Sequence, residues 1–157
     1  MKRYYLFLIL SLFLVTCTSD DDICTSGEAT PRLKIKFRDT ENKIYRISQI
    51  FVDADYGNGM VNVVEAKNVD SVLVPLRVDD SPFTKLQIRE TADGESSTIL
   101  INYNTKSEYV SPACGVKRLY ENIDGTLEKP NPVVQIQKLQ NEIYNESQTH
   151  FYFIFNP

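Results

Sequence analysis

The chain has 157 residues, with 17 Lys and Arg against 21 Asp and Glu, a formal net charge of −4. This length fits one domain of ordinary size with its own core. The acidic balance, together with the lack of any dense run of Lys or Arg, argues against nucleic acid as a partner and against a polybasic membrane-binding patch.

The first residues have the pattern of a lipoprotein signal peptide. Lys2-Arg3 precede an apolar run from Leu6 to Val15 that is too short for a spanning helix, and Cys17 follows. We expect residues 1–16 to be removed and Cys17 to be lipidated, so that several acyl chains anchor the protein in a membrane. The alternative is an ordinary secretory signal, although Leu14-Val15-Thr16 lacks the small residues that such cleavage prefers.

The residues after Cys17 indicate where the anchored protein is displayed. Ser19 is followed by Asp20, Asp21 and Asp22, and this arrangement resembles the acidic export tag of Bacteroidetes-type surface lipoproteins. The resemblance implies a lipid-anchored outer-membrane protein on the cell surface. The alternative is the periplasmic face of the membrane, with the three aspartates acting only as a solvated spacer.

Lipidation of Cys17 leaves two cysteines, Cys24 and Cys114. Disulfides persist beyond the inner membrane, so we expect these two to pair. Closing a loop of about 90 residues would stabilise the fold by roughly 4 to 5 kcal/mol on the chain-entropy account. Two free thiols or an intermolecular bridge are the alternatives. Neither cysteine belongs to a CxxC pair or to a His/Cys cluster with zinc-ligand spacing.

Apolar and basic residues alternate from Arg32 to Arg38, which predicts a half-buried strand with Leu33, Ile35 and Phe37 on its inner face. The basic outer face is interpreted as solvated, with a surface for an acidic ligand as the alternative. The following segments predict a turn at residues 39–42, one or two short strands at 44–54, a turn at 55–59, and a strand at 71–78 that is at a sheet edge or bends at its proline.

The second half predicts a hairpin of residues 83–90 and 97–103. Residues 104–112 are interpreted as a connection and residues 116–120 as a short strand. Asp124-Gly125 and residues 130–132 are turn signals, and strands are predicted at residues 133–139 and 149–155. The last strand is apolar on both faces, so we expect it to be central and covered on both sides.

Short strands separated by turn signals, with no helical periodicity, predict an all-β fold. We expect an antiparallel β-sandwich, immunoglobulin-like or of a related Greek-key type, over residues 32–157. A linker at residues 17–31 precedes it.

Few residues have catalytic potential. His150 is the single histidine, and no nucleophile, zinc-protease or phosphate-loop motif occurs, so we expect a structural histidine and no catalytic residues. Asp53, Asp55 and Asn58 carry oxygen ligands near two glycines but lack the full alternation of a calcium loop, and a plain turn is preferred. We therefore predict no metal, no cofactor and no enzyme. Two carboxylates facing each other across a cleft would be the remaining route to catalysis, of the glycosidase type.

Most of the mature sequence resembles an uncharacterised family of short Bacteroidetes-type lipoproteins, a domain of unknown function. The segments that carry the resemblance are Asp22-Ile23-Cys24, Thr30-Pro31 before Leu33-Lys34-Ile35-Lys36-Phe37, Val74-Pro75-Leu76, and Ser111-Pro112-Ala113-Cys114-Gly115. The two cysteines at the ends of this pattern support the same disulfide. The family has no assigned activity.

Three functions remain open. The leading one is a membrane-anchored envelope lipoprotein with a non-catalytic binding or assembly role toward an envelope protein. The second is a surface glycan-binding or glycan-hydrolysing module, and the third is a purely structural envelope subunit. A flat apolar patch would favour the first, a groove with exposed tyrosines beside acids the second, and neither feature the third.

Overall fold

Strands make up all the regular structure in the computed structural model, which describes residues 29–157. In chain order they are β1 (Leu33–Asp39), β2 (Ile47–Asp55), β3 (Met60–Val69), β4 (Ser71–Val74), β5 (Phe83–Arg89), β6 (Ser97–Ser111), β7 (Gly115–Lys129), β8 (Val133–Lys138), β9 (Glu142–Ile143) and β10 (Phe151–Phe155). The predicted all-β fold is therefore confirmed. No helix that could cross a membrane occurs within residues 29–157.

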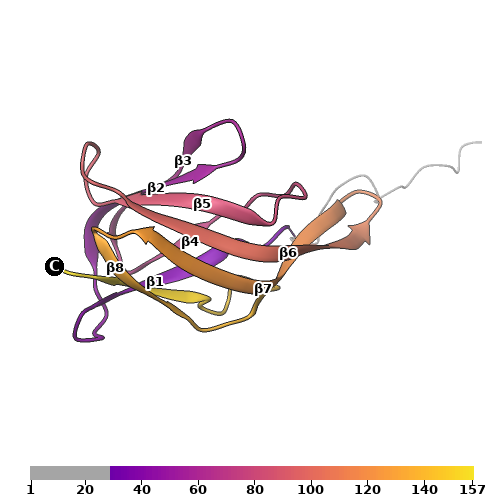
Figure 1. Cartoon of the computed structure of the whole chain (residues 1–157). Coiled ribbons are helices and arrows are strands. Elements are labelled where there is room, and N and C mark those ends of the chain that lie inside the picture. Colours follow the sequence, from indigo (N-terminus) through magenta and orange to yellow (C-terminus); the bar gives the residue numbers. More distant parts are fainter. Residues whose placement is uncertain (1–28) are drawn as a thin grey trace, which may run out of the picture.

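The strands form two sheets that pack face to face as a β-sandwich (Figure 1). The large sheet has the strand order β3-β2-β5-β6-β7-β9, and all its neighbouring strands are antiparallel. The small sheet has the order β4-β1-β10-β8. Its central strands β1 and β10 are parallel, which is the one departure from the predicted antiparallel arrangement. The first and last strands are thus neighbours.

β1 buries the face that its alternating sequence predicts. Leu33, Ile35 and Phe37 are at most 1% exposed. The large sheet supplies the facing apolar side chains, which include Ile50, Val52, Leu86, Ile88, Ile99 and Ile101. Full burial of such side chains is worth about 1.5 to 3 kcal/mol each, so this contact between the sheets is the main source of stability.

β10 is central, as predicted, but it is covered on one side only. Its inner face consists of three phenylalanines that are at most 1% exposed, Phe151, Phe153 and Phe155. Tyr152 and Ile154 are half-buried on the outer face. The expected cover on both sides is wrong, because neighbouring long side chains provide the outer shielding instead. The guanidinium of Arg38 lies 3.6 Å from the centroid of the Tyr152 ring.

The sequence interpretation missed β3. This strand is at the edge of the large sheet and most of its side chains are exposed, so it lacks the alternation that marks a half-buried strand. The strand predicted at residues 71–78 ends at Val74, where Pro75 offers no N–H to a ladder. The predicted edge position of that strand is confirmed.

The predicted hairpin is confirmed by the pairing of β5 with β6. However, β6 continues to Ser111 and β7 covers residues 115–129, so the predicted connection at 104–112 and the turn at Asp124-Gly125 are wrong. Figure 1 shows the far part of the β6–β7 hairpin reaching beyond the rest of the sandwich. That part has no facing sheet, so its strands need no apolar face.

Gly125 is inside β7 because the small sheet approaches it closely. A Cβ atom at this position would lie 2.9 Å from Ile136 Cδ1 and 3.0 Å from Phe151 Cε1. Both distances are shorter than ordinary van der Waals contact. Glycine here makes room for side chains of the opposite sheet, and it does not mark a turn.

Buried tyrosines hold the connection between β4 and β5. The Tyr120 hydroxyl donates to Arg77 O at 3.1 Å. Arg77 N donates to Thr84 Oγ1 at 3.0 Å, and this hydroxyl lies 2.6 Å from that of Tyr103. Burial raises the pKa of both tyrosines above their usual value. Both phenols therefore stay protonated at neutral pH and remain able to donate.

We predict that Gly125→Ala lowers the free energy of unfolding by about 1 to 3 kcal/mol, because the added methyl overpacks the space between the sheets. Urea unfolding measures this loss. The double variant Gly125→Ala/Ile136→Val removes the Cδ1 atom that the new methyl would meet, and it should recover part of the stability. A single variant as stable as the parent would contradict the close approach.

Candidate functional site

The sandwich is open on the side where β3 and β4 lie. These are the end strands of the large and small sheets, and a single residue, Asp70, separates them. Phe37 N donates a hydrogen bond to Asp70 O at 2.9 Å, which fixes this corner to β1. Two edge strands from different sheets therefore flank the same opening.

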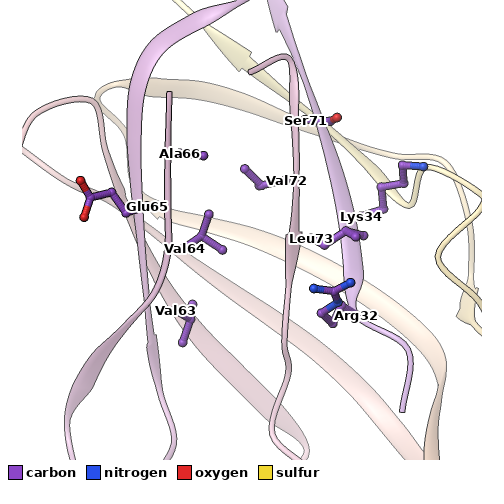
Figure 2. Close-up of a pocket in the computed structure, with 9 residues that line it drawn as sticks. All are labelled: Arg32, Lys34, Val63, Val64, Glu65, Ala66, Ser71, Val72 and Leu73. Atoms are coloured by element: carbon purple, nitrogen blue, oxygen red, sulfur yellow. The ribbon is translucent and has the colours of Figure 1, made fainter. Parts of the chain in front are cut away.

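A cleft of about 480 Å³ occupies this opening, and we call it the edge cleft. Its lining is mixed, with five apolar residues, Val63, Val64, Ala66, Val72 and Leu73, and four polar or charged ones, Ser71, Glu65, Arg32 and Lys34. Figure 2 shows Val64 and Ala66 of β3 and Val72 of β4 directed into the space between the strands, whereas Glu65 points to the other side of β3.

β3 presents ten residues of edge beside this cleft. Among residues 29–157 only β2 pairs with it, so one side of its backbone has no strand partner. Charged residues commonly protect such edges, and β3 carries Glu65 and Lys67. Its first residues are apolar, however, with Met60 37% and Val61 52% exposed. The start of the edge is thus suited to accept another strand.

A polar cluster holds β3 onto β2. Asp53 is 6% exposed and forms an ion pair with Arg89. Asn62 Nδ2 of β3 donates to Asp53 Oδ1 at 2.8 Å. The pairing register shifts between Val52 and Asp53, and such a bulge bends the strand pair. Asp53 therefore serves the sheet, since a buried carboxylate requires partners of this kind.

Asp55 closes the turn between β2 and β3. Its Oδ1 atom accepts from Gly57 N at 2.8 Å and from Gly59 N at 3.3 Å. Asp53 and Asp55 each have protein partners of their own, and those of Asp55 are the backbone N–H groups of a turn. The expected absence of a metal at these residues stays a prediction. No group of three or more His, Cys, Asp or Glu residues in the described range could hold a metal.

A larger groove, of about 800 Å³, begins at residues 29–32 and is bounded by residues 144–146. The one carboxylate in the lining of this groove, that of Glu146, accepts hydrogen bonds from Arg32 Nε at 2.7 Å and from Arg32 Nη2 at 2.8 Å. These hydrogen bonds hold the pKa of Glu146 below its usual range. Tyr144 is 43% exposed beside it and donates to Glu121 at 3.1 Å. This is the arrangement of tyrosine beside acids that we associated with a glycan site.

Carboxylates are dispersed among the grooves of the described chain. Five grooves each have one in their lining: Glu65, Glu146, Asp79, Asp39 and Glu142. Glycosidases use two carboxyl groups roughly 5 to 10 Å apart across one site. None of these five grooves combines two carboxylates.

The N-terminal residues singled out in the sequence lie outside the described range. They are Cys17, Ser19, Asp20, Asp21, Asp22 and Cys24. Cys114 lies between β6 and β7 and is engaged in a disulfide. Its partner is outside residues 29–157, so the pairing with Cys24 stays a prediction. Thr30 Oγ1 accepts a hydrogen bond from Arg118 N at 2.9 Å, which places the start of the described chain beside β7.

His150 is 1% exposed at the start of β10. The Nδ1 atom of its ring accepts a hydrogen bond from Lys34 N at 2.8 Å, and the backbone N–H of His150 donates to Lys34 O at 2.9 Å. Desolvation and the nearby Lys34 charge lower the pKa of His150, while the Asn145 backbone opposes that effect. The neutral imidazole thus extends the pairing of β1 with β10, in the structural position expected for it.

Sequence reasoning did not find the β3 edge, although one signal was present. Asn58-Gly59 is a strong hairpin turn signal, and Met60-Val61 with Val63-Val64 follow it directly. A turn of this type predicts a returning strand even where alternation is absent. The position of that strand beside β4 depends on the fold and has no local signal.

The structure defines an all-β sandwich whose clearest surface feature is an open edge. The chain belongs to a family of unknown function (DUF6452), whose family model matches residues 47–155. The match extends from the start of β2 to the end of β10. No curated protein and no solved structure matches the chain. The predicted membership of an uncharacterised family is confirmed, and its lipoprotein type stays a prediction.

We predict that His150 makes stability depend on pH. Its folded-state pKa lies below the usual 6.5, so its contribution is complete above that pH and is lost as the pH falls toward the lowered value. His150→Asn keeps an acceptor for Lys34 N. It should flatten the plot of the free energy of unfolding against pH below about pH 6.5, reducing its slope by up to about 1.4 kcal/mol per pH unit. Urea unfolding at several pH values tests this. Parallel curves for parent and variant would contradict it.

Proposed function

We propose that this protein is a lipid-anchored outer-membrane protein, displayed on the cell surface, that binds another envelope protein without catalysing a reaction. The observation that supports binding most directly is the ten-residue edge of β3 beside the edge cleft, whose lining includes five apolar residues. Each of five grooves has a single carboxylate in its lining, which supports the non-catalytic part.

The occupant that fits the edge is an extended segment of the partner protein. An added strand obtains affinity from backbone hydrogen bonds and specificity from pockets that take alternate side chains. The unpaired backbone groups of β3 would supply the hydrogen bonds, and the space between Val64 and Val72 would take an apolar side chain of the added strand. The margin carries Arg32, Lys34 and Glu65, so the partner segment would be apolar at its centre and polar at its ends.

The membrane anchor is inferred from the N-terminal pattern. Acyl chains on Cys17 would hold the chain in the membrane. Seven residues lead from Cys17 to Cys24 and span at most about 25 Å when fully extended. A Cys24–Cys114 disulfide would therefore keep the domain close to the membrane surface, where an envelope partner would meet it.

A second candidate function is binding of a glycan at the cell surface. The groove of about 800 Å³ with Tyr144 favours it, because Tyr144 is exposed and bonded to Glu121. The single carboxylate in that lining, Glu146, is already bound to Arg32, which favours binding over hydrolysis.

We predict that Cys17→Ala moves the protein out of the detergent phase, because the acyl chains are its only strong membrane affinity. Detergent-phase partitioning of cell extracts measures this. Cys24→Ala is the matched control, since it removes a cysteine of the same segment and should leave partitioning unchanged. Retention of Cys17→Ala in the detergent phase would refute the anchor and leave the binding proposal standing.

We predict that Val61→Lys weakens partner binding at least roughly tenfold, because strand addition would bury the new charge. A photo-crosslinker at the exposed Lys67 position on β3, used in intact cells, should give one discrete product that Val61→Lys abolishes. Val134→Lys is the matched control on β8, the opposite edge of the small sheet. Equal yield from both lysine variants would contradict binding at β3.

A further inference from the structure

The outer face of the small sheet carries a polar surface that shares one residue, Ser71, with the edge cleft and none with the groove beside Tyr144. Ser71, Lys36, Tyr152 and Gln137 form a row across the four strands, since each is the register partner of the next. Arg38, Ile154 and Gln135 form the adjoining row across three strands. No outward position of these strands holds Asp or Glu. Asp39, at the end of β1, lines a groove together with Gln135, Gln137 and Ile154. We call these two rows the basic face.

Positive charge on the basic face is not neutralised. The side chain of Lys36 is exposed and forms no hydrogen bond or ion pair with the described residues. Arg38 stacks on Tyr152 and donates to the neutral amide of Asn42 at 2.5 Å. Neither cation has a carboxylate partner. An acidic chain that leaves two cations unpaired on one flat face offers that face to an anion.

The outer face of the large sheet shows the contrast. Lys85 there pairs with Glu128 at 3.4 Å. Arg89 pairs with Asp53. These two cations are matched within their own sheet, whereas Lys67 and Lys129 of that sheet are exposed without an ion pair among the described residues. The basic face differs in that two such cations, Lys36 and Arg38, lie at successive outward positions of one strand.

We propose that the basic face binds an acidic polysaccharide. Lys36 and Arg38 would take carboxylate or sulfate groups of the glycan. Their spacing of two residues along one strand is about 7 Å, and neighbouring strands add polar groups about 4.8 Å apart. The amides of Gln135 and Gln137 would hydrogen-bond sugar hydroxyls. The Ser71 hydroxyl donates to Asp70 Oδ1 at 3.1 Å, so it would serve the sugar as an acceptor. A flat array of mixed donors and acceptors fits a sugar chain, which carries several hydroxyls for each charge.

Other polyanions fit this face less well. Specific binding to nucleic acid commonly uses six to ten phosphate contacts, and a membrane-binding basic cluster uses about four to eight cations. Two unpaired cations supply neither. An acidic peptide would add to a strand edge, but β1 and β10 are both paired on each side, so recognition depends on side chains alone.

The two cations of the basic face, Lys36 and Arg38, lie on the central strand β1, and of the residues in its rows Ser71 alone also lines the edge cleft. The experiment uses the purified full chain in detergent and isothermal titration calorimetry. Polygalacturonate and dextran sulfate are the acidic probes, and uncharged dextran is the neutral one. Vesicles containing phosphatidylglycerol and a single-stranded DNA oligonucleotide are competing anions.

Lys36→Glu should weaken binding of the acidic probe by at least roughly tenfold, since a charge-assisted hydrogen bond is replaced by repulsion. Lys129→Glu, on an exposed residue of β7 in the large sheet, makes the same change in net charge and should leave affinity within roughly twofold. Lys36→Gln, which keeps a polar side chain, should show an intermediate loss. Unchanged unfolding midpoints would establish that all three variants fold.

Four results would overturn the proposal. They are no binding of either acidic glycan at low salt, equal binding of neutral dextran, equal losses in Lys36→Glu and Lys129→Glu, and tighter binding of vesicles or DNA than of both glycans. Loss of glycan binding would leave the edge proposal intact, because that proposal concerns a different surface.

Discussion

The parallel pairing of β1 with β10 is the constraint on which the rest of the structure depends. It places the alternating first strand beside the phenylalanine-rich last strand at the centre of the small sheet. At one end the imidazole of His150 accepts a hydrogen bond from Lys34 N. At the other end the rings of Phe37 and Phe155 pack edge to face, with their centroids 5.4 Å apart. The inner faces of these two strands then pack closely enough on the large sheet to require glycine at position 125.

The same pairing determines which surfaces remain available. With β1 and β10 at the centre, the short strand β4 becomes an edge next to the longer edge strand β3. The two edges enclose the edge cleft, and backbone groups as well as apolar side chains are accessible there. The outer faces of β1 and β10 offer side chains alone. One sandwich thus presents two surfaces of different chemistry, one suited to a strand and one to an acidic ligand.

Sequence patterns predicted the elements that bury one face and missed those that do not. Leu33, Ile35 and Phe37 alternate because one side of β1 is core, and this was readable. β3 and the far part of the β6–β7 hairpin are largely exposed, so no alternation marks them. Gly125 suggested a turn because its reason, the approach of Phe151 from the other sheet, is non-local. The candidate site depends on the adjacency of β3 and β4, which no local pattern encodes.

The central claim is that a partner strand pairs with β3. Amide hydrogen exchange of the purified protein, compared with the protein cross-linked to its partner, tests it most directly. The account predicts slower exchange at alternate amides of β3, with the buried amides of β1 and β10 unchanged. Unchanged exchange along β3, with protection confined to the groove beside Tyr144, would contradict it.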